Sequence, residues 1–436
     1  MQVAIIGGGM AGLSAAAALA DQGIQITLFE AGPHFGGRAR SVAIEFNSQT
    51  FQVDNGQHIL LGAYHETLKL LAKVGVNEQQ AFLRLPLALN MHSPRNKQTF
   101  KLSSPSYLLF PINQLIGFLC CQGLSFSERI SAIIFIAKLK RTRYRLTLDE
   151  PLKDFLLKNG QSRLLINFLW EPLCLAALNT PIALASSKIF LNVLHDAFNQ
   201  TKSDSDFLIP KLDLSQILAT PIVRYLQTKQ ATLLTNKRIR SIKPFENGFQ
   251  VSTRLEMFEF SHVIIATAAR KLKELTVDLP KLEFVTSQTE AYDYQPIYTV
   301  YLQYPNQTTL PQPMLGLVDV TSQWVFDRGQ LCGQQGLIAV VISAEGKHQK
   351  LTQDALALKV AQELHLAFPY LPKPLWHKVI AEKRATFSCN VNLPRPSNIT
   401  PYANLLLAGD YTYSDYPATI EGAVRSGITC ANLILK

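Results

Sequence analysis

Three glycines near the N-terminus have the spacing of a phosphate-binding turn. Gly7, Gly9 and Gly12 follow a short apolar run, residues 3–6, in a G-x-G-x-x-G pattern. In such a turn the first glycine makes the tight bend, the second lets the backbone approach a pyrophosphate, and the third lets the next helix pack close to the strand. The amides and the positive dipole end of that helix then face the phosphates. This stretch therefore predicts the binding of a dinucleotide.

The residues around the glycines predict a strand, a helix and a second strand. The apolar run has the length and branching of a buried parallel strand, Met10 and Ala11 open an alanine-rich helix over residues 10–20, and residues 25–29 form the next strand. Glu30 ends that strand, at about the separation from the glycines where a ribose-binding carboxylate belongs. A carboxylate accepts hydrogen bonds from ribose hydroxyls and repels a 2′-phosphate, so FAD or NAD is favoured over NADP.

A second glycine turn carries an arginine and indicates FAD. Gly36, Gly37 and Arg38 follow Glu30 in the chain. A guanidinium can donate two parallel hydrogen bonds to phosphate oxygens, and a domain that binds only NAD has no need of this extra contact. The arrangement resembles the FAD-binding signature of the flavin amine oxidase and phytoene desaturase superfamily.

The C-terminal part of the chain supplies a second half for the same site. A buried strand over residues 404–408 ends in Gly409 and Asp410, and Thr419 and Ile420 open a final helix. An aspartate after such a strand suits a bond to the ribityl or pyrophosphate part of FAD. The start of the helix would bring amides and positive dipole close to the flavin N1 and O2 atoms, where negative charge collects on reduction.

The superfamily resemblance implies further residues beside the cofactor. It implies that a loop formed by Asn55, Gly56, Gln57 and His58 passes the flavin ring. It also implies that a buried strand ending at Ala266 returns to the nucleotide-binding domain, and that Ile239 lies near the adenine. No His or Cys occupies a position from which a covalent tether could be argued. We therefore expect noncovalent FAD.

The composition is that of a globular protein in a reducing compartment. The 436 residues, 47% of them hydrophobic and 17% charged, support a sizeable core. The six cysteines show no C-x-x-C pair and no metal-ligand spacing, so we expect buried thiols and no metal site. A net charge of +10 suits nucleic acid or an anionic membrane surface, but no nucleic-acid motif is present. We expect a cytoplasmic protein, peripheral on the inner face of the cell membrane.

We predict an α/β fold in which a Rossmann-like FAD-binding domain of the amine oxidase and phytoene desaturase type is interleaved with an α+β substrate domain. The FAD-binding domain is expected to be discontinuous, built from residues 1–84, 229–285 and 389–436. Residues 85–228 show long helical patterns and form the expected helical, membrane-facing part. Residues 286–388 read as a run of strands with one helix, which predicts an antiparallel sheet as the floor of a substrate cavity.

Two apolar stretches stand out in the helical part. Residues 107–121 and 130–137 are strongly apolar, and neither is long enough to span a bilayer. A capping box over residues 125–128 opens the second helix, which runs into a basic cluster of Lys138, Lys140, Arg141, Arg143 and Arg145. Such a helix suits an enzyme that rests on an anionic membrane to draw in a lipid. A core helix with a solvated basic end shows the same pattern.

The resemblance narrows when several stretches are taken together. They are residues 53–64 (VDNGQHILLGAY), 170–181 (WEPLCLAALNTP), 205–215 (SDFLIPKLDLS), 383–389 (KRATFSC) and 405–427 (LLLAGDYTYSDYPATIEGAVRSG). Together these stretches resemble the squalene-associated FAD-dependent desaturase family, whose members act as hydroxysqualene dehydroxylases in bacterial squalene and hopanoid synthesis. Residues 411–416 depart from the Asp/Thr/Gly/Trp character expected there, which affects only the detail of the cavity.

This resemblance implies a reductive reaction on a lipophilic isoprenoid. Hydroxysqualene and reduced flavin would give squalene, water and oxidised FAD, with the flavin reduced by a donor that the sequence does not identify. The hydroxyl is allylic, so its departure leaves a delocalised cation that hydride from flavin N5 can quench. Hydroxide leaves poorly, so a general acid should protonate it, and an apolar cavity would raise the pKa of a carboxylic acid toward that role.

Three residues are candidates for this acid, and each has an alternative structural role. His58 could instead form a hydrogen bond that stabilises its loop, Glu171 an ion pair within a helix, and Glu421 a favourable charge at a helix N-terminus. Solvent or the flavin environment could also supply the proton.

Other functions share parts of the pattern. A carotenoid or polyprenoid desaturase would use the same fold in the opposite redox direction. An amine oxidase would need an aromatic cage for a neutral amine, for which Tyr411, Tyr413 and Tyr416 are available, although packing roles suit these tyrosines better. A prenyl-binding protein that had lost its flavin would not need the glycines and charged residues of both halves of the predicted site.

Overall fold

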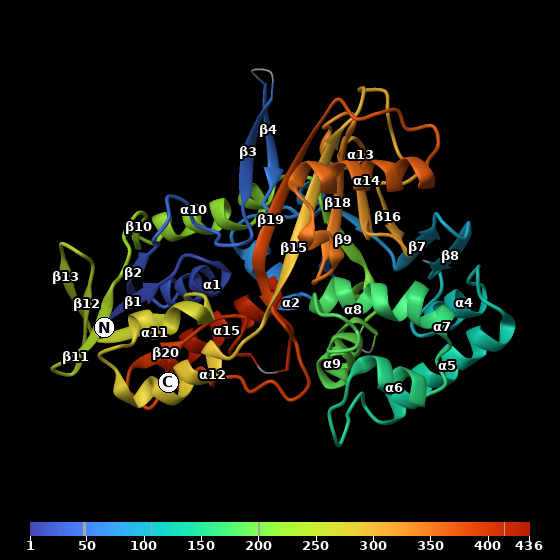
Figure 1. The fold of residues 1–436 in the computed structure, drawn as a ribbon. Helices are drawn as coiled ribbons and strands as arrows, with labels where there is room; N and C mark the ends of the chain where they lie inside the picture. The colour runs from blue at the N-terminus through green and yellow to red at the C-terminus, as the bar shows by residue number, and fades with distance from the viewer. Residues whose placement is uncertain (47–48, 106, 199–200, 414) are drawn as a thin grey trace.

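The computed structural model describes residues 1–46, 49–105, 107–198, 201–413 and 415–436. Figure 1 shows a nucleotide-binding lobe that holds both chain termini, a sheet lobe above and beside it, and a helical part below the sheet. Two long strands run from the sheet lobe down to the nucleotide-binding lobe, so the two lobes meet along these strands (Figure 1).

A parallel five-stranded sheet forms the centre of the nucleotide-binding lobe. Its order is β10 (Thr232–Leu234), β2 (Gln25–Phe29), β1 (Gln2–Ile6), β14 (His262–Ile265) and β20 (Leu405–Leu407). The strands of this sheet are largely buried runs of Val, Ile and Leu because both faces of a parallel sheet are covered. The strands expected over residues 25–29 and 262–266 are confirmed as β2 and β14.

The helix α1 (Met10–Ala20) fills the space between this sheet and the final helix α15 (Ile420–Ile434). Its small side chains are almost all buried, which lets the two helices approach closely. A Cβ atom added to Gly427 of α15 would lie 2.2 Å from the carbonyl oxygen of Ala11, so only glycine fits at this contact. The predicted helix over residues 10–20 is confirmed.

The sheet lobe is a seven-stranded sheet. Its order is β19 (Trp376–Phe387), β15 (Tyr294–Gln303), β18 (Leu337–Ser343), β17 (Trp324–Asp327), β16 (Met314–Leu317), β7 (Ala88–Ser93) and β8 (Gln98–Ser103). All neighbours are antiparallel except β16 and β7. The helix α14 (Gln353–Ala367) packs on one face, and the other face turns Thr299 and Tyr301 of β15 toward the rest of the molecule.

The helical part contains α4 (Ile112–Leu119), α5 (Phe126–Arg141), α6 (Leu152–Lys158), α7 (Arg163–Leu165), the π-helical turn η1 (Ile166–Trp170), α8 (Glu171–Leu178) and α9 (Ser187–Phe198). The predicted capping box is confirmed, because the Ser125 side chain accepts from the Glu128 amide and the Glu128 side chain accepts from the Ser125 amide. Trp170 is buried at the centre, where its ring contacts those of Phe135 and Phe190. Among the described residues, no helix is both long and apolar enough to cross a bilayer.

Shorter elements connect these layers. They are β3 (Ser41–Phe46), β4 (Gln49–Asp54), β5 (Leu60–Leu61), α2 (His65–Lys73), α3 (Glu78–Ala81), β6 (Phe82–Leu85), η2 (Lys202–Ser205), β9 (Phe207–Pro210), η3 (Ser215–Ala219), α10 (Thr220–Thr228), β11 (Ser241–Phe245), β12 (Gly248–Ser252), β13 (Met257–Phe260), η4 (Ala269–Lys271), α11 (Leu272–Leu275), η5 (Pro280–Leu282), α12 (Glu283–Glu290), α13 (Arg328–Cys332) and η6 (Lys347–Lys350).

The structure changes the expected boundaries of the helical part, residues 85–228, at both ends. The hairpin β7–β8 belongs to the seven-stranded sheet, because its alternating buried side chains need the sheet face as a partner. At the other end, η3 and α10 pack on α1, with Ile217, Ile222 and Leu226 fully buried in the core of the nucleotide-binding lobe. The helical part is therefore shorter than predicted.

Candidate active site

The first glycine turn forms a cradle with open space at its centre. A Cβ atom on Gly12 would lie 2.0 Å from the carbonyl oxygen of Gly7, and one on Gly7, whose φ is +114°, would lie 2.5 Å from the carbonyl oxygen of Ala266. A Cβ atom on Gly9 would meet nothing within 4 Å. Gly7 and Gly12 thus hold the turn together, while Gly9 borders free space at the N-terminus of α1. This is the arrangement that a pyrophosphate requires.

Glu30 lies beside this cradle at the end of β2. Its carboxylate accepts hydrogen bonds from the amides of Gly8 (2.9 Å) and Gly32 (2.7 Å), one on each oxygen. Each oxygen therefore keeps a second lone pair for a ribose hydroxyl. The amide of Lys237 donates to the Glu30 carbonyl at 2.9 Å, so the segment that leads to the buried Ile239 runs alongside, as expected for an adenine contact.

Arg38 and Asp410 bring the two predicted halves of the site together. Gly36 and Gly37 have positive φ values and turn the chain back over the cradle, where the Gly36 amide donates to the Gly8 carbonyl at 2.8 Å. The Arg38 guanidinium pairs with the Asp410 carboxylate at 2.7 Å and donates to the Ala385 carbonyl of β19 at 2.5 Å. The neighbouring carboxylate raises the pKa of Arg38 above its ordinary value.

Hydroxyl groups without partners lie near this pair and beside the glycine cradle. The buried hydroxyl oxygens of Thr267, Tyr294 and Tyr411 have no hydrogen-bond partner among the described residues. Tyr294 and Tyr411 lie close enough to Asp410 for its charge to raise their pKa values, in addition to the larger effect of burial. A buried hydroxyl is rarely left unpaired. The open cradle, the carboxylate and these hydroxyls fit a polar cofactor such as FAD.

The loop expected to pass the flavin ring lies against β15 and a buried arginine. The Asn55 amide donates to the Arg40 carbonyl at 2.9 Å, which ties this loop to the second glycine turn. Arg328, almost fully buried, donates to Gln57 Oε1 at 2.6 Å. Gln57 Nε2 and the Thr299 hydroxyl have no partner among the described residues. Both polar atoms are therefore available to a bound molecule near Gly56.

His58 is held as a neutral imidazole. Its Nδ1 lies 2.5 Å from the Gly56 carbonyl oxygen, so Nδ1 carries the hydrogen and donates it. Burial lowers the pKa of His58 below its ordinary value. A neutral imidazole with its only N–H hydrogen committed to the backbone has no proton to give a leaving hydroxyl. The geometry supports the structural role of His58, a hydrogen bond that stabilises its loop.

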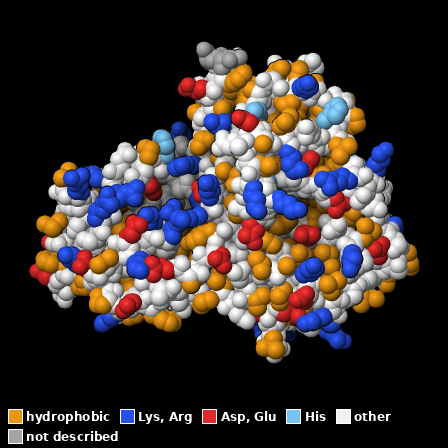
Figure 2. Space-filling model, viewed as in Figure 1, with side chains coloured by type: hydrophobic (Ala, Val, Ile, Leu, Met, Phe, Trp, Pro, Cys, Tyr) orange, Lys and Arg blue, Asp and Glu red, His pale blue; other side chains and the backbone are white. Residues whose placement is uncertain are grey.

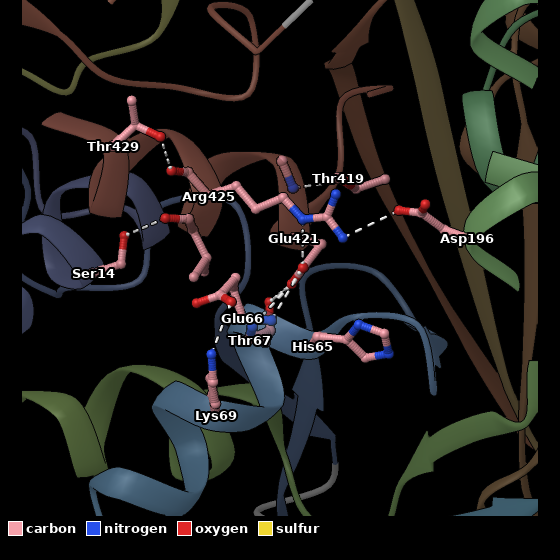
Figure 3. Close-up of polar contacts among 12 residues, drawn as sticks. Ser14, His65, Glu66, Thr67, Lys69, Asp196, Thr419, Glu421, Arg425 and Thr429 are labelled. Atoms are coloured by element: carbon pink, nitrogen blue, oxygen red, sulfur yellow. Dashed lines mark hydrogen bonds and ion pairs between the residues drawn. The ribbon is translucent and has the colours of Figure 1, made fainter. Parts of the chain in front are cut away.

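Glu421 caps a neighbouring helix instead of facing a substrate. Its fully buried carboxylate accepts from the amides of Glu66 (3.2 Å) and Thr67 (2.9 Å) and from the Thr67 hydroxyl (2.7 Å), at the N-terminus of α2. Arg425, one turn further along α15, donates to it at 2.7 Å and pairs with Asp196 at 3.2 Å (Figure 3). All of these partners donate hydrogen bonds to the Glu421 carboxylate. Thr419, which caps α15 by accepting from the Gly422 amide, precedes it.

Glu171 has a favourable pKa but not a favourable position. It begins α8, and burial raises its pKa, with Lys153 lowering it and Asp319 raising it. The other end of α8 meets β15 and β19 through Asn179, about 12 Å along the helix axis. The structure therefore does not bring Glu171 to the Arg38–Asp410 pair. Among the described contacts of the three candidate acids, none joins one candidate to another.

Asn179 and Arg328 are site residues that the sequence analysis did not identify. The Asn179 side chain donates to the Thr386 hydroxyl at 2.9 Å and accepts from the Ala344 amide at 2.7 Å, so it joins α8 to the seven-stranded sheet. Arg328 follows β17 directly and reaches a loop 271 positions earlier in the chain. A single Asn after a helix or a single Arg after a strand carries no sequence pattern that distinguishes it.

An apolar cavity lies in the helical part. Its volume is about 220 Å³, and it is enclosed by α4, α5, α8, α9 and the hairpin β7–β8, with Leu89, Leu102, Ile112, Leu115, Ile136 and Leu173 among its lining residues. Tyr144 forms part of its wall and also part of the wall of a polar cavity of about 480 Å³, which Arg425 of α15 lines as well. The two cavities are therefore neighbours that share Tyr144, and the polar one reaches α15.

Fold and site together define an FAD-dependent oxidoreductase. A model of the flavin containing amine oxidoreductase family matches residues 10–435. The chain belongs to this family, and the predicted α/β fold and FAD cofactor are confirmed.

Relatives that match this chain over its full length include hydroxysqualene dehydroxylases and a zeta-carotene desaturase. The hydroxysqualene dehydroxylase of Zymomonas mobilis is 26% identical over 454 residues, which cover 99% of this chain and 98% of the relative. The hydroxysqualene dehydroxylase of Rhodopseudomonas palustris is also 26% identical, with 99% and 98% covered. The zeta-carotene desaturase of Synechocystis is 23% identical over 488 residues, covering 100% and 97%.

Solved structures share the fold over the whole chain. An oxidoreductase from Methanosarcina mazei superposes with a TM-score of 0.76 at 15% identity, and all of both chains is covered. A putrescine oxidase variant superposes with a TM-score of 0.73 at 16% identity, covering 100% of this chain and 99% of the other. At such identities the similarity establishes the fold alone.

Proposed function

We propose that this protein is a hydroxysqualene dehydroxylase, which replaces the allylic hydroxyl of hydroxysqualene by hydrogen to give squalene and water. The observation that carries the proposal is the apolar cavity, because its lining suits a long hydrocarbon chain and offers no carboxylate to a charged amine. Full-length similarity to proteins named hydroxysqualene dehydroxylase supports the same substrate class.

Bound FAD in its reduced form would supply the hydride. The chain's own residues then have three tasks. The glycine cradle and the Arg38–Asp410 pair hold the cofactor, Gln57 and Thr299 offer polar contacts beside the predicted flavin loop, and the apolar walls exclude water from an allylic cation. A dry, apolar site favours quenching of that cation by hydride over capture by water.

In this proposal the leaving hydroxyl takes its proton from solvent on the polar side of the site, beside Gln57 and Thr299, while the apolar walls keep water from the allylic carbons. Glu421 is ion-paired, His58 is neutral with its N–H committed, and Glu171 lies away from the cofactor contacts. The position of a general acid matters before its pKa, because the proton donor must lie within hydrogen-bond reach of the leaving oxygen.

An anaerobic single turnover tests the proposed reaction. The bound flavin is photoreduced, hydroxysqualene is added in detergent, and the return of oxidised flavin absorbance is followed together with lipid analysis. We expect reoxidation with formation of an equal amount of squalene. Bleaching of the oxidised enzyme by a polyene, with no reoxidation by hydroxysqualene, would instead identify a desaturase, in line with the relatives that carry that name.

The same assay tests the source of the proton. We expect Glu171→Gln to slow the single turnover by less than about tenfold, because loss of a true general acid costs roughly a hundredfold or more. Lys153→Met, which removes the nearby positive charge and leaves Glu171 in place, is the matched variant. A loss of a hundredfold in Glu171→Gln alone would make Glu171 the acid and would contradict a solvent proton.

A further inference from the structure

The helices α4 and α5 and the segment just before α4 leave large apolar side chains in solvent. The exposed fractions are 80% for Leu109, 53% for Ile112 and 44% for Leu115 on one side, and 70% for Phe126 and 62% for Ile134 on the other. Isolated exposed leucines are common on soluble proteins, but a group of them around one pair of contacting helices marks an interaction site. We call these five residues the apolar rim.

The apolar rim continues into the apolar cavity. Ile112 and Leu115 are half exposed and also line the cavity. Ile133 and Ile136 of α5 line it from the other helix, one position before and two positions after the exposed Ile134. The surface and the interior are therefore parts of one apolar region that α4 and α5 both border. A molecule that enters here meets hydrocarbon from the surface inward.

A group of positive charges borders the apolar rim. Lys138, Arg141, Arg143 and Arg145 at and beyond the end of α5 are exposed, and none of them pairs with a carboxylate among the described residues. Ile134, Lys138 and Arg141 share one face of α5, because residues three or four positions apart lie on the same side of a helix. Figure 2 shows hydrophobic side chains interspersed with Lys and Arg over the part of the molecule where Figure 1 places α4 and α5.

We propose that the apolar rim and the adjoining basic residues bind an anionic lipid bilayer, and that the isoprenoid passes from the bilayer into the apolar cavity between α4 and α5. The entry of the isoprenoid through the cavity rests on the proposed function, whereas the binding of the bilayer does not. Apolar side chains flanked by cations match the hydrocarbon and the anionic headgroups of a membrane surface. Binding to such a membrane would also explain why basic residues that form no ion pair are clustered beside exposed apolar side chains.

A second copy of the chain is a poorer occupant for this face. In a two-fold dimer the same patch meets itself, so the unpaired cations of both copies would be brought close together. Like charges across an interface oppose association. An anionic bilayer turns the same charges into an attraction.

Flotation of the FAD-loaded protein with vesicles tests the binding. The vesicles contain phosphatidylcholine alone or phosphatidylcholine mixed with phosphatidylglycerol. We expect at least about tenfold stronger binding to the anionic vesicles, and a loss of that preference in the variant Arg141→Gln/Arg143→Gln/Arg145→Gln. The variant Phe126→Ser/Ile134→Ser should bind neither kind of vesicle and should keep its flavin spectrum, because neither residue lines the cavity.

A matched control uses exposed apolar residues elsewhere. Leu255 (90% exposed) and Val277 (75%) lie in the nucleotide-binding lobe, and Leu255→Ser/Val277→Ser should bind vesicles like the wild type. Equal loss in this control, or no binding by the wild type, would overturn the proposal. A wild-type dimer that ignores vesicles and becomes monomeric in Phe126→Ser/Ile134→Ser would show that the rim is a protein interface, which also overturns it.

Turnover with hydroxysqualene in vesicles tests the entry route. We expect Phe126→Ser/Ile134→Ser to slow flavin reoxidation at least tenfold with substrate in anionic vesicles and to leave the rate with substrate in detergent unchanged. Equal rates in vesicles for wild type and variant would overturn entry from the bilayer. If the wild type makes no squalene in detergent, the proposed function fails, while the flotation result still decides the membrane surface.

Discussion

Glu421 illustrates how a residue with apparent catalytic chemistry can have a structural role. The carboxylate comes from α15, yet it caps the N-terminus of α2 through the Glu66 and Thr67 amides. Its negative charge is stabilised by the dipole of α2 and by Arg425. The ring of Tyr416 lies under the same guanidinium, 4.6 Å from its carbon, so the pair is shielded from water on that side. The result is a fixed joint between two helices of the nucleotide-binding lobe.

Replacement of Glu421 should therefore affect stability before chemistry. We expect Glu421→Gln to lower the free energy of unfolding by about 3 kcal/mol, because removal of one partner leaves a partly buried guanidinium with less compensation. Urea denaturation of the FAD-loaded protein measures this. The control Glu66→Gln removes a surface pair with Lys69 on the same turn of α2 and should change stability by less than about 1 kcal/mol. Comparable losses in both variants would contradict the capping role.

At the scale of elements, different glycines of the β1–α1 turn serve folding and cofactor binding. Gly12 is required by the protein itself, because a Cβ atom there would collide with the Gly7 carbonyl at 2.0 Å. Gly9 has an ordinary negative φ of −78° and free space around it. A methyl group on Gly9 would occupy the space where we expect the pyrophosphate.

The two glycines should accordingly respond differently to alanine. We expect Gly9→Ala to fold, with a circular dichroism spectrum like that of the wild type, and to purify with little FAD. Gly12→Ala should be destabilised by several kcal/mol, roughly the range of severe core overpacking, and should be recovered in low yield. The ratio of flavin to protein absorbance and the thermal midpoint distinguish the two outcomes. A yellow, stable Gly9→Ala protein would show that the cradle does not hold the cofactor.

Asp54 at the end of β4 also connects distant segments, but through a buried carboxyl group without an ion-pair partner among the described residues. Its carboxylate, 1% exposed, accepts from the Leu214 amide at 2.8 Å, and its carbonyl accepts from the Tyr301 hydroxyl at 2.8 Å. Burial raises the pKa of Asp54 from 3.8 to about 6. Arg328 lies near enough to oppose this shift but does not form an ion pair with Asp54. The ionised carboxylate is therefore a source of instability at neutral pH.

This shift predicts a pH dependence with a defined sign. Between about pH 4 and pH 6 the folded protein holds a proton that the unfolded chain has lost, so stability falls as the pH rises through this window. The full shift corresponds to about 3 kcal/mol. We expect Asp54→Asn to lack this loss, so its stability relative to the wild type should increase by about 2–3 kcal/mol from pH 4 to pH 7. Parallel curves of unfolding free energy against pH would contradict a buried, raised carboxyl.

Elements with local signals could be predicted from the sequence, and elements with distant partners could not. The glycine turn, α1 and β2 follow from residues within one short stretch, and the capping box of α5 is likewise local. The sequence does not place the hairpin β7–β8 in the sheet, because its partner strand β16 lies more than 200 residues further along the chain. The contacts of Arg328 with Gln57 and of Asn179 with Thr386 also join residues more than 200 positions apart in the sequence, so no local pattern predicts them.

The whole molecule is organised around contacts between distant segments. Arg38 and Asp410, separated by 372 positions, pair beside Ala385 of β19, so the N-terminal turn, the sheet lobe and the C-terminal strand meet at one point. Asn179 adds the helical part to the same junction through Thr386, the next residue of β19. On the face shown in Figure 2, Lys and Arg side chains gather over the nucleotide-binding lobe, where they favour an anionic cofactor.

Because the predicted cofactor contacts come from all of these segments, FAD should stabilise the molecule as a whole. At a free FAD concentration one hundred times its dissociation constant, the gain is about 2.7 kcal/mol. We expect the thermal midpoint of the apoprotein to rise with added FAD in a single transition that both lobes share.

Asp410→Asn leaves Arg38 without its charged partner and should need roughly ten- to a hundredfold more FAD for the same rise, since a charge-assisted hydrogen bond contributes about 1.5–3 kcal/mol. Thr412→Val, whose hydroxyl bonds Ser426 and the Gly409 carbonyl, changes the same turn without altering its charge. An equal shift in both variants, or two separate transitions in the wild type, would mean that the Arg38–Asp410 junction does not couple cofactor binding to the whole fold.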